Sequence, residues 1–294
     1  MYAVSEDVRC KPGSRRKRGL LRNGMRTIRA ARGGTPYVGG ACISGTQGSG
    51  AVFFSGCSLR CIFCQNFEIA EGNCAKEISG ERLSEIFLEL QEQGAANINL
   101  VTAAHYVPAV IESLKKAKAQ GMDLPVIYNS SGYERVETVQ MLGRGCGCLV
   151  PDFKYMDSKL AFAYSRAKDY PEVARAAIRE MMKAAGTCAY DEDGYIQKGV
   201  IVRHLILPGH TKNSIAVLDE LYGTYGDDLT ISLMNQYTPL PQVRNIPDLN
   251  RRVTKREYEK VLDHALDLGI TQGFFQEGGT AKESFIPLFD YEGL

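Results

Sequence analysis

The chain has 294 residues, of which 44% are apolar, and a net charge of +1. This composition is sufficient for a substantial buried core and excludes a mostly disordered chain. No apolar run approaches the roughly 18 residues that a membrane helix needs. The N-terminus has no hydrophobic stretch of the signal-peptide type, and Glu6 and Asp7 argue against a transit peptide. We therefore expect a cytoplasmic protein with no membrane partner.

The positive charge is concentrated at the N-terminus. Residues 1–67 contain eleven Lys and Arg but two acidic residues. One interpretation is a nucleic-acid-binding arm, because clustered basic side chains neutralise phosphates. We favour a basic, poorly ordered arm over residues 1–41, since aromatics and apolar periodicity are lacking between Val8 and Tyr37. Nucleic acid is therefore not the expected partner, and a single folded domain is predicted over residues 42–294.

Strand and helix patterns alternate along that domain. Apolar runs rich in β-formers predict strands at 51–56, 97–102, 126–129, 149–152, 200–207, 230–234 and 273–276. Helical periodicity, with Ser79 as a cap and Pro108 as an opening residue, predicts helices at 79–94, 108–121, 134–142, 158–186, 214–221 and 254–268. Such alternation predicts an α/β fold with a parallel sheet. The carboxyl ends of its strands share one edge, where chemistry is usually located.

Three cysteines follow the first of these strands. Cys57, Cys61 and Cys64 have the spacing C-x3-C-x2-C. Thiolates are soft ligands suited to iron–sulfur clusters and zinc. A cubane has four irons, so three cysteines from one loop leave one iron open. An open iron can chelate a small molecule, and S-adenosylmethionine offers an amino and a carboxylate group for that purpose. The spacing therefore favours a [4Fe–4S] cluster with one open iron.

A structural zinc site is the alternative. Zinc of this kind has four protein ligands, and Cys74 is available as the fourth. Zinc modules usually carry paired C-x2-C knuckles rather than a triplet after a buried strand, so we favour the cluster. The Arg-, Gly- and Cys-rich segments 9–41 and 143–148 fit the surrounding pattern poorly. We predict no second metal site at Cys10, Cys42, Cys146 or Cys148.

The motifs resemble those of a known superfamily. C-x3-C-x-aromatic-C, with Phe63 in the aromatic position, is similar to the signature of radical S-adenosylmethionine (radical SAM) enzymes. The wider series GSGAVFFSGCSLRCIFCQN, NINLVTAAHYVP, YNSSGY, PDFKYMD, VRHLILPG and SLMNQYTP resembles uncharacterised proteins related to pyruvate formate-lyase activating enzyme. The resemblance runs from about residue 42 to the C-terminus.

The resemblance implies a fold and a reaction. The fold is a partial (β/α)6 barrel, in agreement with the strand–helix alternation, which repeats about six times. The reaction is reductive cleavage of S-adenosylmethionine to a 5′-deoxyadenosyl radical, which abstracts a hydrogen atom from the substrate. An electron donor such as flavodoxin or ferredoxin and a protein or peptide substrate, as in glycyl-radical enzyme activation, are the implied partners.

Further site residues are assigned by the same resemblance. Asp152 and Lys154 match the Asp-x-Lys of activating enzymes and are the predicted catalytic pair; both project to the same side of a strand. Asn129 and Ser130 align with an Asp-Thr pair that helps to bind a cation in those enzymes. Here an amide replaces the carboxylate, so we predict contacts of these neutral oxygens with the cofactor rather than a cation site.

The remaining cofactor contacts are predicted at other strand ends. Thr102 and His105 follow the second strand, where many members carry Gly-Gly-Glu for the cofactor's amino group. Arg203 is expected to face the barrel interior and contact a carboxylate or ribose, whereas His204 is as readily a core histidine. Gln236 is predicted at the adenine pocket, and Phe63 completes the cofactor-binding set.

Two other functions remain open. The basic arm suggests a radical SAM enzyme that modifies RNA, and the cysteines alone also allow a zinc-binding module without catalysis. The metal content of protein purified without air distinguishes the zinc-binding module from an iron–sulfur enzyme.

Overall fold

The structure is a computed structural model that describes residues 27–37, 41–143, 145–271, 273–275 and 289–294. One mixed sheet has the strand order β10-β9-β8-β6-β5-β4-β2-β1-β3, with β7 paired to β8. The strands are β1 (Ile28–Tyr37), β2 (Ser49–Phe54), β3 (Lys76–Ile78), β4 (Ile98–Val101), β5 (Val126–Ser130), β6 (Cys148–Pro151), β7 (Ala189–Tyr190), β8 (Ile196–Leu205), β9 (Thr230–Met234) and β10 (Gly273–Phe275).

Along the strand order given above, every pair from β2 to β10 is parallel, whereas β7 is antiparallel to β8. Strand β1 is antiparallel to both β2 and β3. Within the described residues, no ladder joins β10 to the β1–β3 edge, so the barrel is partial. The predicted α/β class and parallel partial barrel are therefore confirmed.

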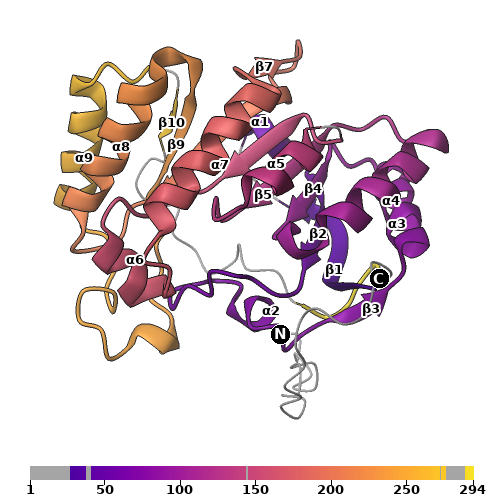
Figure 1. Cartoon of the computed structure of the whole chain (residues 1–294), viewed down its shortest axis with the longest axis horizontal. Coiled ribbons are helices and arrows are strands. Elements are labelled where there is room, and N and C mark those ends of the chain that lie inside the picture. Colours follow the sequence, from indigo (N-terminus) through magenta and orange to yellow (C-terminus); the bar gives the residue numbers. More distant parts are fainter. Residues whose placement is uncertain (1–26, 38–40, 144, 272, 276–288) are drawn as a thin grey trace, which may run out of the picture.

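Helices connect the parallel strands (Figure 1). Among the longer helices, α3 lies beside α4 near one edge of the sheet, and α8 lies beside α9 near the other edge. The helices are α1 (Ala41–Ser44), α2 (Phe67–Ala70), α3 (Gly80–Glu92), α4 (Val107–Ala119), α5 (Val136–Leu142), α6 (Ser158–Ser165), α7 (Tyr170–Ala185), α8 (Thr211–Tyr225) and α9 (Lys255–Asp267). In the described part of the chain, none is long and apolar enough to cross a membrane.

The local signals explain several of these boundaries. The Ser79 hydroxyl accepts a hydrogen bond from the Arg82 amide at 3.1 Å and caps α3 as predicted. The single helix predicted over 158–186 is instead two helices. Arg166 adopts a left-handed conformation with φ of 55°, which ends α6 before α7 begins.

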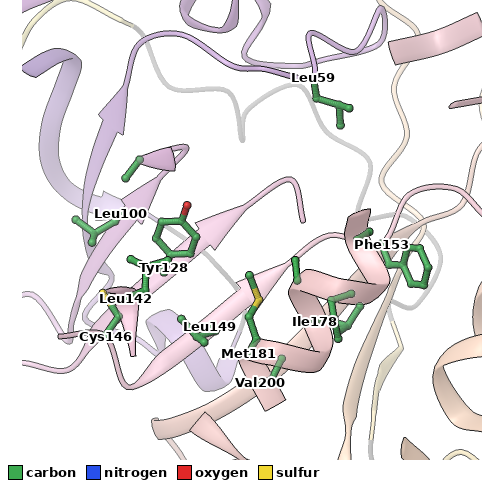
Figure 2. Close-up of a cluster of buried hydrophobic side chains, with 14 of the residues drawn as sticks. Leu59, Leu100, Tyr128, Leu142, Cys146, Leu149, Phe153, Ile178, Met181 and Val200 are labelled. Atoms are coloured by element: carbon green, nitrogen blue, oxygen red, sulfur yellow. The ribbon is translucent and has the colours of Figure 1, made fainter. Parts of the chain in front are cut away.

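The two faces of the sheet bury different sets of side chains. Tyr128, Leu149 and Val200, from neighbouring strands, pack with Ile178 and Met181 of α7 in the core between sheet and helices (Figure 2). The opposite face is the interior of the partial barrel. By strand register it carries Asn99, Val101, Ile127, Asn129, Cys148, Val150, Ile201 and Arg203.

Strand β1 corrects the predicted domain boundary. Residues 28–37 pair with β2 and β3, so the sheet begins before residue 42. The Arg32 side chain is bonded to Asp290 at 3.0 Å, which neutralises one of the arginines that made this segment resemble an arm. The first 26 residues of the predicted arm lie outside the described residues.

Candidate active site

The loop that carries the three cysteines leaves β2 at the carboxyl edge of the sheet. Gly56 has a φ of 98°, a conformation that favours glycine and turns the chain toward Cys57. The amides of Gly56 and Cys57 donate to the carbonyl oxygens of Ile69 and Ala70 at 2.8 and 3.0 Å. These bonds attach the start of the loop to α2.

The far half of the loop is attached to other elements. The Ile62 amide donates to the Tyr164 carbonyl oxygen of α6 at 2.9 Å. Phe63 is buried and packs edge-on against the rings of Tyr164 and Tyr237, with centroid distances of 6.4 and 6.2 Å. Tyr237 donates to the Leu249 carbonyl oxygen at 2.7 Å, so it is a packing residue. Phe63 holds the loop, and its predicted contact with a cofactor stays a prediction.

The three cysteines are free thiols that influence one another electrostatically. Burial raises the pKa of Cys61, and the neighbouring Cys57 acts in the same direction. Burial and the other two cysteines raise the pKa of Cys64 to about 12. A bound cationic group would stabilise the thiolates that are costly here without one.

This donor set fits an iron–sulfur cluster. Three soft sulfur ligands lie on one loop, and the Ser165 hydroxyl donates to the Cys61 sulfur at 3.1 Å. Among the described residues, no three His, Cys, Asp or Glu side chains are placed to hold a single metal ion. A cubane is wider than a single ion, and its ligand sulfurs stand further apart. Cys74, the predicted fourth ligand of a zinc site, lies in a separate apolar cluster with Phe53 and Phe289.

A charged network occupies the carboxyl ends of β5, β6 and β8. The Asp152 carboxylate forms ion pairs with Lys154 and with Arg203, whose Nε donates to Oδ1 at 3.0 Å. The second guanidinium arm of Arg203 donates to Oδ1 of Asn129 at 2.6 Å. The side chains of Asp152, Lys154 and Arg203 are 14%, 16% and 20% exposed. The structure thus brings together four predicted site residues, Asn129, Asp152, Lys154 and Arg203.

The network sets the charges of its members. Burial alone would raise the pKa of Asp152, but Arg203 and Lys154 outweigh it and lower the pKa. Burial alone would lower the pKa of Lys154, but Asp152 and Cys61 outweigh it and raise the pKa. Asp152 is therefore a carboxylate and Lys154 an ammonium at neutral pH. The effect of Lys154 on Cys61 connects this network to the cysteine loop.

Thr102 and His105 lie beside these two groups. Thr102 follows β4 with a φ of 63°, which is rare for a β-branched residue and marks backbone strain. Its amide donates to the Asn129 carbonyl oxygen at 3.0 Å. A methyl group at position 56 would lie 3.5 Å from Cδ2 of His105, so the imidazole borders the start of the cysteine loop. Partial burial and Arg60 lower the pKa of His105.

Ser130 and Gln236 occupy the same edge with different partners. The buried Ser130 hydroxyl accepts a bond from the Gly132 amide at 3.2 Å, which stabilises the turn after β5. Gln236 follows β9, and its amide group lies 3.7 Å from the Met234 sulfur. His204 is fully buried and bonded to the Phe153 carbonyl oxygen and the Ser214 hydroxyl; burial lowers its pKa to about 4. It is a core histidine.

Sequence reasoning missed two residues that fix the backbone of this network. The Tyr170 hydroxyl accepts from the Lys154 amide at 2.9 Å and lies 3.0 Å from the Asp152 carbonyl oxygen. Asn213 donates to the Lys154 carbonyl oxygen at 3.0 Å. Both come from helices distant in sequence, and no local motif marks them.

Known proteins with similar sequences and structures were compared with the chain. No protein-family model matches it. An uncharacterised protein of Methanocaldococcus jannaschii (MJ0674) is 27% identical over 224 residues, which are 74% of this chain. The chain spans 62% of that protein's length.

Similar solved structures include a domain of pyruvate-formate lyase-activating enzyme from Bacteroides vulgatus. It is 18% identical, with 58% of this chain and 92% of that domain covered and a TM-score of 0.41. Streptococcus suis SuiB bound to S-adenosylmethionine is 14% identical, with a TM-score of 0.48; the match covers 77% of this chain and 49% of SuiB. Spore photoproduct lyase with bound AdoMet is 14% identical, with a TM-score of 0.49; the match covers 75% of this chain and 73% of the lyase.

Proposed function

We propose that this chain is an iron–sulfur enzyme of the radical SAM type. The observation that carries the proposal is a C-x3-C-x2-C loop at the same sheet edge as the Asp152–Lys154–Arg203 network. Cys57, Cys61 and Cys64 would hold three irons of a [4Fe–4S] cluster and leave the fourth for S-adenosylmethionine. When bound, the reduced cluster and cofactor would supply a 5′-deoxyadenosyl radical for hydrogen abstraction.

In this proposal the chain's own residues fix the cysteine loop, orient the cationic side chains and exclude water from one side of the loop. The bonds to α2 and α6 fix the cysteine loop before any cluster is present. The Lys154 ammonium favours the thiolate form of Cys61. Asp152 holds Lys154 and Arg203 in place, and their remaining N–H groups would bind an anionic group such as a carboxylate. The packed rings of Phe63 and Tyr237 cover one side of the loop and exclude water there.

The substrate class and partners form the finer part of the proposal. By resemblance to activating enzymes, we propose hydrogen abstraction from a protein or peptide, such as glycyl-radical enzyme activation. A flavodoxin or ferredoxin would supply the electron, and the cytoplasm would be the location. RNA modification rests on the basic arm, residues 1–41, of which 1–26 and 38–40 lie outside the described residues.

The test is anaerobic reconstitution of the chain with iron and sulfide, followed by reduction and addition of S-adenosylmethionine. We expect iron with matching acid-labile sulfide, and 5′-deoxyadenosine as a product. Cys57→Ser, Cys61→Ser and Cys64→Ser should each abolish the product, whereas Cys188→Ser should retain it. Zinc without iron, or no cluster after reconstitution, would refute the enzyme and favour a zinc-binding module.

A further inference from the structure

A second group of three cysteines lies at the opposite end of the barrel. Cys148 is the first residue of β6, and Asp152 follows the last residue of the same strand. Cys42 lies on α1, and Cys188 lies between α7 and β7. All three border one apolar cluster at the amino ends of the strands, which includes Ile127 and Ile201. This group is remote from the carboxyl edge where Cys57 is found.

Gly199 explains how Cys188 approaches Cys148. Gly199 is the register partner of Cys148 on the neighbouring strand. A methyl group at Gly199 would overlap the Cα atom of Cys188 and lie 2.7 Å from its amide nitrogen. The φ of Gly199 is 118°, and its amide donates to the Gly147 carbonyl oxygen at 3.0 Å. A glycine is therefore required here, and its missing side chain makes room for Cys188.

The three thiols share one apolar environment, because Cys42 and Cys188 pack against the cluster that contains Cys148. Burial raises the pKa of Cys42 and of Cys148; Cys188 acts in the same direction on Cys42, and both act so on Cys148. All three are free thiols, and Cys148 is fully buried while Cys42 and Cys188 are partly exposed. A reagent in solution can therefore reach Cys42 and Cys188 but not Cys148.

We propose that Cys42 and Cys188 form a thiol–disulfide site, in which oxidation links α1 to the connection between α7 and β7. The oxidant is a low-molecular-weight disulfide such as oxidised glutathione. One S–S bond forms between the two cysteines, their two S–H bonds break, and the S–S bond of the oxidant is cleaved. The two electrons and two protons lost by the cysteines yield two molecules of reduced thiol.

The order of the two exchange steps follows from the environments. Burial and the neighbouring Cys188 raise the pKa of Cys42 to about 11, which makes it a poor first nucleophile. Cys188 therefore attacks the oxidant first and forms a mixed disulfide. Cys42 then displaces the bound thiol and closes the cross-link. Cys148 stays reduced throughout because solvent does not reach it.

The experiment treats the full-length, cluster-loaded protein with oxidised glutathione under anaerobic conditions, then maps the cysteines after alkylation. Digestion with trypsin and chymotrypsin separates Cys42 from Cys57, because Phe53 and Phe54 lie between them. We expect a cross-linked pair of peptides carrying Cys42 and Cys188, cleaved again by dithiothreitol. The cross-linked protein should also melt at a higher temperature than the reduced protein, because the closed loop restricts the unfolded chain.

Three variants make the assignment decisive. Cys42→Ser should trap one glutathione on Cys188, whereas Cys188→Ser should trap none on Cys42. Cys146→Ser is the matched control, because Cys146 is buried in the core between sheet and helices. In this variant the cross-link between Cys42 and Cys188 should form as in the parent protein. Free thiols at both Cys42 and Cys188 after treatment, or a cross-link that includes Cys148, would overturn the proposal.

Discussion

Asp152, just after the end of β6, lies opposite Arg203 of the neighbouring parallel strand β8, and a backbone bridge and a side-chain ion pair join these two residues. The backbone pairing sets the distance at which the charges meet. Lys154, two residues further on, reaches the same carboxylate. A single acidic residue thus pairs with two cations at the candidate active site.

Asp152→Asn should leave both cations without their carboxylate. Because this network is largely buried, we expect a loss of about 2–4 kcal/mol in the free energy of unfolding, and at least a tenfold lower yield of 5′-deoxyadenosine. Urea unfolding and product analysis measure the two effects. Glu112→Gln removes the exposed pair with Lys115 and should cost less than about 1 kcal/mol. Equal effects of the two variants would contradict a special role for Asp152.

Glu134 should make stability fall as pH rises. Burial raises its pKa from 4.5 to about 7, although the nearby hydroxyls of Tyr128 and Ser130 act in the opposite direction. The folded state holds the proton more tightly than the unfolded state, so this stabilisation is complete below about pH 4.5 and is lost as pH rises through about 7.

Glu134→Gln should remove that dependence, because an amide cannot ionise. We expect the variant to exceed the parent by about 2–3 kcal/mol at pH 8 and to match it within about 1 kcal/mol near pH 4.5. Urea unfolding at both pH values provides the comparison. A variant that is less stable than the parent at pH 8 would show that the ionised carboxylate has a stabilising partner.

Gly132→Ala should disturb the site through its backbone. Gly132 has a φ of 73°, and a methyl group there would overlap the Asp152 carbonyl oxygen. We expect a loss of about 2 kcal/mol or more in stability and a clear decrease in 5′-deoxyadenosine. Gly223→Ala, within α8, meets no atom within 4 Å and should be neutral or stabilising by up to about 1 kcal/mol. Thermal unfolding of both variants tests the contrast.

Ser165→Ala should change the redox potential of the cluster without removing iron. The Ser165 hydroxyl donates to the Cys61 sulfur, and hydrogen bonds to ligand sulfurs stabilise the reduced, more negative state. We expect a lower midpoint potential with unchanged iron content, measured by redox titration followed by electron paramagnetic resonance. Ser158→Ala, at the other end of α6, is the control. An unchanged potential in Ser165→Ala would indicate that the bond is absent once the cluster is bound.

The alternation of the parallel strands β2, β4, β5, β6, β8, β9 and β10 with the longer helices was predictable, because apolar periodicity marks these elements. The short strands β3 and β7 and the division of residues 158–186 into α6 and α7 were not predicted. Strand β1 was also not predictable, because its pairing with β2 and β3 and the Arg32–Asp290 bond involve segments that are distant in the sequence. The strand-end residues Asp152 and Arg203 were predictable from alternation and from the shared edge of parallel strands. Tyr170 and Asn213 were not, since only tertiary packing brings these helical residues to Lys154.

The backbone bonds that tie the cysteine loop to α2 and α6 also bear on how the protein responds to a chelator. Small zinc domains unfold without their metal because the ligands are organised by the metal itself. Here Gly56, Cys57 and Ile62 are held by ordinary amide–carbonyl bonds to helices that pack on the barrel. Removal of iron should therefore leave a folded and refillable apoprotein, with a circular dichroism spectrum close to that of the loaded protein.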